Sequence, residues 1–282
     1  MTTVSTPVST VRIGSAPAIA VDHCGAGPLL VFLHGIGGHR SNWRDQLVAA
    51  APHFHAVAWD ARGYGDSDDY EGPLDFADFS RDLARVMDYF DAPAAHLVGL
   101  SMGGMIIQDF YRRHPERVLS LTLADTRNKF QRANGEEFLR LREAPLLAGL
   151  TPRDIAPKVA DSLAGPRTSA EAKARLVESI AQLHKDSYLK TLRATTLIAQ
   201  REEFLGMPGF VDPKAVKVPT LVICGADDTV TPPEMSRDMA DHIPGAKLAM
   251  IADAGHLSNI EKPVEFNAAM MDFLLACGAA RA

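Results

Sequence analysis

The residues with the clearest chemical potential are Gly99–Gly103, which directly follow the apolar run His96–Val98. A serine with a glycine two residues away on each side suits a sharp turn between a strand and a helix, because larger flanking side chains would collide with the neighbouring element. Such a turn exposes the hydroxyl at the amino end of a helix, which we expect to run from Met102 to about Arg113 and to stop before Pro115. Ser101 is therefore the candidate nucleophile.

A serine hydroxyl is a weak nucleophile at neutral pH, so it needs a base and a third group that orients the base. His256 is the candidate base, and Asp228 is the candidate acid. Both lie in loops that follow apolar runs, where the active sites of parallel sheets collect. Asp227 is the alternative acid, and Asp125 is a second alternative because related folds can place the acid one strand earlier.

Acyl transfer also needs N–H donors aimed at the oxygen that becomes negative. One candidate is the Met102 amide, at a helix start where the dipole favours an anion. The other is the Ile36 amide in His34–Gly38, whose glycines let the main chain approach a substrate. In the same loop Gly35 is a candidate substrate-binding residue. We expect His34 to hold this loop by hydrogen bonds without titrating in catalysis.

The elements that must position these residues are marked by short apolar runs that do not alternate with polar residues. This pattern is typical of strands buried on both faces of a parallel sheet. The runs are Leu29–Leu33, Ala56–Trp59, His96–Leu100, Leu119–Ala124, Leu221–Cys224 and Leu248–Ile251. Helical patterns lie between them, such as Phe79–Phe90 with its apolar stripe. The expected fold class is α/β, a mostly parallel doubly wound sheet. We expect Arg62, in the loop Asp60–Ser67, to tie down neighbouring main chain.

The alternation breaks between Arg127 and Arg201, where the sequence has helical patterns and no strand-like runs. Thr151, Ser169 and Asp186 have the character of helix N-caps. We expect a helical lid inserted into the sheet domain. The chain then divides into residues 1–126, the first part of the core, 127–212, the lid, and 213–282, the second part of the core.

The lid segment is basic, with 14 Lys or Arg against 8 Asp or Glu between Arg127 and Arg201, whereas the rest of the chain has a balance of −12. A basic lid over an acidic core would attract an anionic substrate. Alternatively, these charges dock the lid on the core or lie on solvated helix faces.

The composition narrows the class of protein. An apolar content of 46% and a charged content of 23% are ordinary for a globular protein, and the net charge of −6 argues against nucleic acid as a partner. Three widely spaced cysteines indicate neither a disulfide framework nor a metal site, and no phosphate-binding glycine loop is present, so we expect no metal and no cofactor.

The sequence shows no signal peptide and no 18-residue apolar stretch. We therefore expect a cytoplasmic enzyme that acts on a small molecule and does not bind membranes. A homodimer is left open.

Together these motifs resemble the α/β-hydrolase superfamily over about three quarters of the chain. The matching stretches are His34–Gly35, Asp60–Ser67, Gly99–Gly104, Gly225 with Asp228 and Pro232, and Gly255–His256. The family places its acid three residues after the loop glycine, which implies Asp228. Ser101–Ile106 and His256–Glu261 with Pro263 resemble 3-oxoadipate enol-lactonases and related lactone or ester hydrolases.

The resemblance implies an α/β-hydrolase fold with an inserted helical lid. The implied activity is hydrolysis of an ester or lactone of a small molecule through an acyl-serine, and a carboxylate on that molecule would suit the basic lid. Two alternatives stay open: carbon–carbon bond hydrolysis of a diketone with the same residues, and a ligand receptor with slow turnover. Haloalkane dehalogenase and epoxide hydrolase chemistry is disfavoured, because those enzymes have an aspartate where this chain has Ser101.

Overall fold

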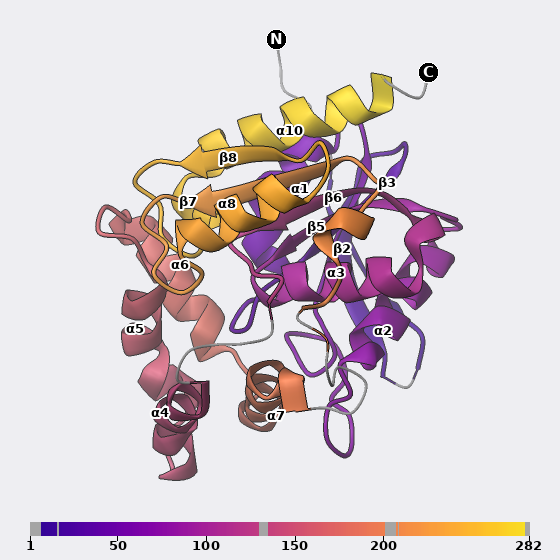
Figure 1. The fold of residues 1–282 in the computed structure, drawn as a ribbon. Coiled ribbons are helices and arrows are strands. Elements are labelled where there is room, and N and C mark those ends of the chain that lie inside the picture. The colour runs from indigo at the N-terminus through magenta and orange to yellow at the C-terminus, as the bar shows by residue number, and fades with distance from the viewer. Residues whose placement is uncertain (1–6, 16, 130–134, 201–206, 208, 280–282) are drawn as a thin grey trace.

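An eight-stranded sheet forms the centre of the molecule, in the order β1-β2-β4-β3-β5-β6-β7-β8 (Figure 1). The strands are β1 Ser9–Ile13, β2 Ile19–Cys24, β3 Leu29–Leu33, β4 His55–Trp59, β5 Ala95–Leu100, β6 Val118–Ala124, β7 Thr220–Gly225 and β8 Lys247–Ile251. Strands β3 to β8 run parallel, whereas β1 and β2 pair in antiparallel fashion with their neighbours. The computed structural model describes residues 7–15, 17–129, 135–200, 207 and 209–279.

Helices cover both faces of this sheet. Helices α1 Arg44–Ala50 and α10 Pro263–Ala279 share one apolar core with the strands, while α2 Ala77–Tyr89, α3 Met102–Arg113 and α8 Pro233–His242 belong to the core on the other face. Alternate residues of β3 serve the two cores, since Leu30 and Phe32 pack in one and Val31 and Leu33 in the other. The predicted doubly wound, mostly parallel sheet is confirmed.

All six apolar runs of the sequence are strands, with ends that differ by no more than a residue from those predicted. The helix predicted from Met102 to about Arg113 is also confirmed. The sequence reasoning missed β1 and β2, which form the antiparallel edge of the sheet. Most side chains of β1 are at least partly exposed, so this strand lacks the continuous apolar run that marks a buried one.

Four helices lie between β6 and β7: α4 Gly135–Leu147, α5 Pro152–Leu163, α6 Ala170–Ala181 and α7 Lys185–Thr196. Figure 1 shows them grouped together on one side of the sheet, away from both ends of the chain. Thr151 and Ser169 are N-caps as predicted, but Asp186 is not, because α7 begins one residue earlier and Asp186 lies in its first turn. Residues 130–134, 201–206 and 208 of the predicted lid lie outside the described residues.

Several cations of the segment between β6 and β7 pair with carboxylates of the sheet domain. Arg175 lies 2.8 Å from Asp45, and Arg167 pairs with Asp253. These contacts favour the interpretation in which basic residues dock the helices on an acidic core. None of the described helices combines the length and the apolar character needed to span a membrane.

Candidate active site

Ser101 occupies a strained turn between β5 and α3. Its backbone has φ +54° and ψ −114°, a conformation that L residues rarely adopt. The two flanking positions have no room for a side chain. A Cβ on Gly99 would lie 2.3 Å from the Gly103 carbonyl oxygen, and a Cβ on Gly103 would lie 2.0 Å from the Leu33 carbonyl oxygen. The Ser101 N–H donates to the Ala124 carbonyl at 2.9 Å, which fixes the turn to β6. The turn is built to hold a serine at the end of the sheet.

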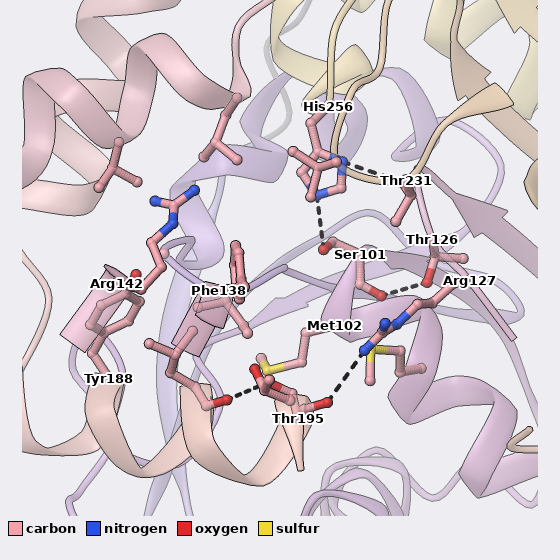
Figure 2. Close-up of a pocket in the computed structure, with 18 of the residues that line it drawn as sticks. Ser101, Met102, Thr126, Arg127, Phe138, Arg142, Tyr188, Thr195, Thr231 and His256 are labelled. Carbon is pink, nitrogen blue, oxygen red and sulfur yellow. Dashed lines mark hydrogen bonds between the residues drawn. The ribbon is translucent and has the colours of Figure 1, made fainter. Parts of the chain in front are cut away.

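The Ser101 hydroxyl begins a chain of hydrogen bonds. Its Oγ lies 2.9 Å from Nε2 of His256 (Figure 2). On the other side of the ring, Nδ1 of His256 lies 2.9 Å from Oδ2 of Asp228. The side chains of His256 and Asp228 are only 4% and 0% exposed. With its Nδ1 proton donated to Asp228, the ring presents an unprotonated Nε2 to the serine hydroxyl, as a general base requires.

The Asp228 carboxylate is held in its charged form. Oδ1 accepts the main-chain N–H groups of Val230 and Thr231 at 2.8 and 3.0 Å, and Oδ2 accepts the Thr231 hydroxyl at 2.7 Å. Burial raises the pKa of Asp228, but the neighbouring His256 and these hydrogen bonds outweigh it, so the pKa lies below its ordinary value. Sequence reasoning missed Thr231, although a hydroxyl three residues after an aspartate could have indicated it.

The two alternative acids have other hydrogen-bond partners. Asp227 is half-exposed, and its main-chain N–H donates to Ala254. Asp125 is fully buried after β6 and accepts the Gly225 N–H at 2.8 Å and the Ser258 hydroxyl at 2.5 Å. Burial, aided by the charge of Asp228, raises the pKa of Asp125 to about 7. The acid that the structure brings to the imidazole is thus Asp228.

Asp125, Cys224 and Asp228 also have potential metal-ligand atoms within 4.8 Å of one another. Both carboxylates are already engaged by the hydrogen bonds just described. Burial raises the pKa of the Cys224 thiol to about 12, whereas a metal ligand must be a thiolate. The chemistry of this donor set does not suit a metal ion.

The proposed oxyanion donors Ile36 and Met102 line the same pocket as Ser101 and His256. Helix α3 begins at Met102, and the first N–H groups of a helix have no partner within it. Gly35 does not line this pocket but an adjoining cavity, although a Cβ on it would lie 3.0 Å from Cβ of Ser101. A side chain at this position would therefore crowd the serine.

His34 holds the loop that contains Ile36. Its Nε2 accepts the Ala61 N–H at 3.0 Å, and its Nδ1 lies 2.8 Å from the Gly35 carbonyl, to which it donates. Burial lowers the pKa of His34 to about 4, so the ring is neutral at physiological pH. Arg62 binds main chain as expected in one contact, a donation to the Asp78 carbonyl at 3.4 Å, but its shorter contacts are with the carboxylates of Asp78 and Asp82 on α2.

The pocket at Ser101 encloses about 880 Å³ of space, part of it open to solvent. Its walls come from the sheet domain and from α4 to α7, and most of the side chains are apolar. Apart from His256, the charged groups among its described residues are Arg127 and Arg142, and no carboxylate lines it. The guanidinium carbon of Arg142 lies 5.3 Å from the ring centroid of Phe138, another residue of the pocket wall (Figure 2). Sequence reasoning did not single out either arginine, because the spacing of the helical segment gives no sign of which cations face inward.

Comparison with known proteins places the chain in a family. The family model described as the alpha/beta hydrolase fold matches residues 28–263. The chain is an α/β hydrolase. Its resemblance to enol-lactonases is also confirmed, since this α/β hydrolase is 29% identical to 3-oxoadipate enol-lactonase 2 of Acinetobacter baylyi, over 86% of its own length and 87% of the relative's.

Other relatives of this α/β hydrolase carry different names. A putative carbamate hydrolase, RutD, of Azorhizobium caulinodans is 32% identical, over 90% of this chain and 92% of the relative. The solved structure of a thermophilic esterase from Thermogutta terrifontis superposes with a TM-score of 0.84 at 26% identity, covering 95% of this chain and 99% of that one. These similarities indicate a hydrolase enzyme and leave the bond that it cleaves to be argued from the site.

Proposed function

We propose that this α/β hydrolase is a serine hydrolase that cleaves an ester or lactone bond of a small, carboxylate-bearing molecule through an acyl-serine intermediate. The observation that carries the proposal is the hydrogen-bonded sequence from Ser101 through His256 to Asp228, with both contacts at 2.9 Å. A nucleophile, a base and a group that orients the base are the requirements of acyl transfer to serine.

In the acylation step the Ser101 oxygen attacks the carbonyl carbon while its proton passes to Nε2 of His256. The carbonyl oxygen becomes an oxyanion, for which the Ile36 and Met102 amides are the proposed donors. The tetrahedral intermediate collapses as His256 returns the proton to the leaving oxygen. In a lactone that oxygen stays attached to the acyl group.

In the deacylation step water attacks the acyl-serine carbonyl and gives a proton to His256. Collapse of the second tetrahedral intermediate breaks the bond to Ser101, whose oxygen recovers the proton. The product is a free acid. Throughout both steps Asp228 stays ionised and stabilises the imidazolium, in agreement with the lowered pKa of its carboxyl.

The charges of the pocket support a carboxylate on the substrate. Arg127 is 8% exposed and donates to the Thr195 carbonyl at 3.3 Å, and Arg142 donates to Ser162 at 2.9 Å. Arg142 also lies over the Phe138 ring, with its guanidinium carbon 5.3 Å from the ring centroid. Both guanidinium groups carry a positive charge. The lining residues that the structure describes are mostly apolar and include no carboxylate, so an anionic substrate group would be attracted to the positive charge of either arginine.

A substrate panel tests this proposal. It pairs lactones and aryl esters that carry a free carboxylate with their neutral methyl-ester analogues, and adds a carbamate and a vinylogous diketone. We expect the highest kcat/KM for the carboxylate-bearing lactones or esters, and loss of nearly all turnover in Ser101→Ala. Preference for the diketone would instead indicate carbon–carbon bond hydrolysis, and tight binding with a single slow turnover would indicate a receptor.

A further inference from the structure

The loop that carries His256 is fastened at every main-chain N–H from residue 255 to residue 258. The bonds run from Gly255 to Glu261 Oε2 at 3.0 Å, from His256 to the Leu163 carbonyl at 2.9 Å, from Leu257 to Glu261 Oε1 at 3.2 Å and from Ser258 to Asp125 Oδ2 at 3.2 Å. Glu261 therefore accepts from the residues on either side of the imidazole. Its carboxylate fixes the main chain from which that side chain projects.

The same carboxylate also contacts the inserted helices. Oε2 of Glu261 accepts the Gly165 N–H at 2.9 Å and the Thr168 hydroxyl, both from the connection between α5 and α6. Four donors thus converge on two oxygens, which is about the number of lone pairs that a carboxylate offers. Glu261 is 7% exposed, so water cannot easily replace these partners. One buried group joins the His256 loop to the insertion.

The two segments also touch directly, main chain against main chain. A Cβ on Gly165 would lie 2.7 Å from the Gly255 nitrogen, and a Cβ on Gly255 would lie 2.3 Å from the Gly165 nitrogen. The glycines thus leave no side chain between the α5–α6 connection and the His256 loop. A displacement of that connection must either move the loop or break its hydrogen bonds.

Helices α5 and α6 in turn form part of the pocket wall, through Val159, Leu163 and Ile180. We propose that Glu261 is a positioning residue for His256, through which the place of the α5–α6 connection determines whether Nε2 of His256 reaches the Ser101 hydroxyl. This inference rests on the proposed function, because it assigns His256 the role of general base. It predicts that acylation of Ser101 is fast only when the insertion is seated on the His256 loop.

The test compares three substitutions in the full-length protein. Glu261→Gln keeps the shape of the side chain, but its amide must face at least one of the four N–H or O–H donors. Thr168→Val removes the hydroxyl that contacts Glu261 Oε2 and the Gly165 carbonyl, and leaves the bonds from Gly255 and Leu257 to Glu261 intact. Glu265→Gln, an exposed position in the first turn of α10, is the matched control.

We expect Glu261→Gln to lower kcat by about 10- to 100-fold with little change in KM, because small displacements of a catalytic group cost rates of this order. Thr168→Val should lower kcat in the same direction by a smaller factor, and Glu265→Gln should leave it unchanged. The downfield proton resonance of the His256–Asp228 hydrogen bond should shift or broaden in the first two variants. A role in stability alone would not change this resonance in the folded protein.

Wild-type kcat and an unchanged resonance in Thr168→Val would overturn the proposed link to the insertion. The same result in Glu261→Gln would overturn the positioning role itself. The resonance reports on His256 without any substrate. Absence of ester or lactone turnover in the wild-type protein would therefore contradict the proposed function and still leave the role of Glu261 measurable.

Discussion

Asp125 and Asp228 follow neighbouring strands and have carboxylate oxygens within 4.8 Å of each other, yet it is Asp228 that contacts the ring of His256. Asp125 instead accepts hydrogen bonds from the N–H of Gly225 and from the N–H and hydroxyl of Ser258. Gly225 lies just before the loop that contains Asp228, and Ser258 lies two residues after His256. The two carboxyls thus differ in partner and in pKa, which lies below the ordinary value in Asp228 and near 7 in Asp125.

Replacement of the acid should affect the rate far more than replacement of its sequence neighbour. We expect Asp228→Asn to lower kcat by roughly 10³- to 10⁴-fold, because an amide cannot stabilise the imidazolium and favours the wrong tautomer of His256. Asp227→Asn is the matched control and should retain wild-type kcat, since its carboxyl is half-exposed. Steady-state kinetics on the preferred ester decides the assignment. Equal losses in both variants would show that the acid has been assigned wrongly.

Asp125 should make the free energy of unfolding depend on pH. Because the folded pKa is raised from 3.8 to about 7, the folded state binds more protons than the unfolded state between these values. Stability from this group is therefore present below pH about 4 and is lost as the pH rises toward 7. His34 has the opposite sign, since its pKa is lowered to about 4 and its contribution is lost as the pH falls.

Asp125→Asn removes the first of these two effects and keeps the second. The difference in unfolding free energy between wild type and variant should fall by up to about 1.4 kcal/mol per pH unit across the window from about 4 to about 7. Urea denaturation at several pH values in this window measures the difference. A constant difference would mean that Asp125 does not titrate there.

Much of this arrangement could be predicted from the sequence, because its signals are local. The strands buried on both faces have continuous apolar runs, and the glycines around Ser101 report a turn that tolerates no Cβ at either position. The positions of Asp228 and His256 after strand ends indicated where their side chains would meet, since the carboxyl ends of parallel strands share one edge of the sheet.

The remainder depends on contacts between segments distant in the chain. Nothing near Glu261 in the sequence reveals that its carboxylate accepts hydrogen bonds from Gly165, 96 residues away. Arg62 could equally bind main chain or carboxylates until α2 is placed beside it. The prediction that Asp186 is an N-cap was wrong, because an aspartate also occurs within the first turn of a helix, where the helix dipole favours an acid.

The turn at Ser101 should tolerate no side chain at Gly103. We expect Gly103→Ala to destabilise the protein by about 3 kcal/mol or more, because its Cβ would lie 2.0 Å from the Leu33 carbonyl oxygen, in main chain that cannot easily move. Gly278→Ala is the control, since no atom lies within 4 Å of a Cβ built there. In α10 that change should stabilise by up to about 1 kcal/mol. Urea denaturation measures both, and a Gly103→Ala protein of wild-type stability would refute the account of the turn.

Arg142 should contribute to the selection of charged substrates. We expect Arg142→Gln to raise KM roughly 10-fold for a carboxylate-bearing ester, because a charge-assisted hydrogen bond is lost, and to leave KM unchanged for the neutral methyl-ester analogue. Arg140→Gln, at an exposed position of α4, serves as the comparison. If both substrates lose affinity equally, Arg142 shapes the pocket without recognising charge.

The most direct test of the mechanism is rapid-quench mass spectrometry of the enzyme mixed with excess 4-nitrophenyl ester. We expect a burst of nitrophenol and, at the same time, the acyl mass on the peptide that contains Ser101, with neither in Ser101→Ala. Release of nitrophenol by wild type with no adduct on that peptide, or wild-type turnover in Ser101→Ala, would contradict the mechanism.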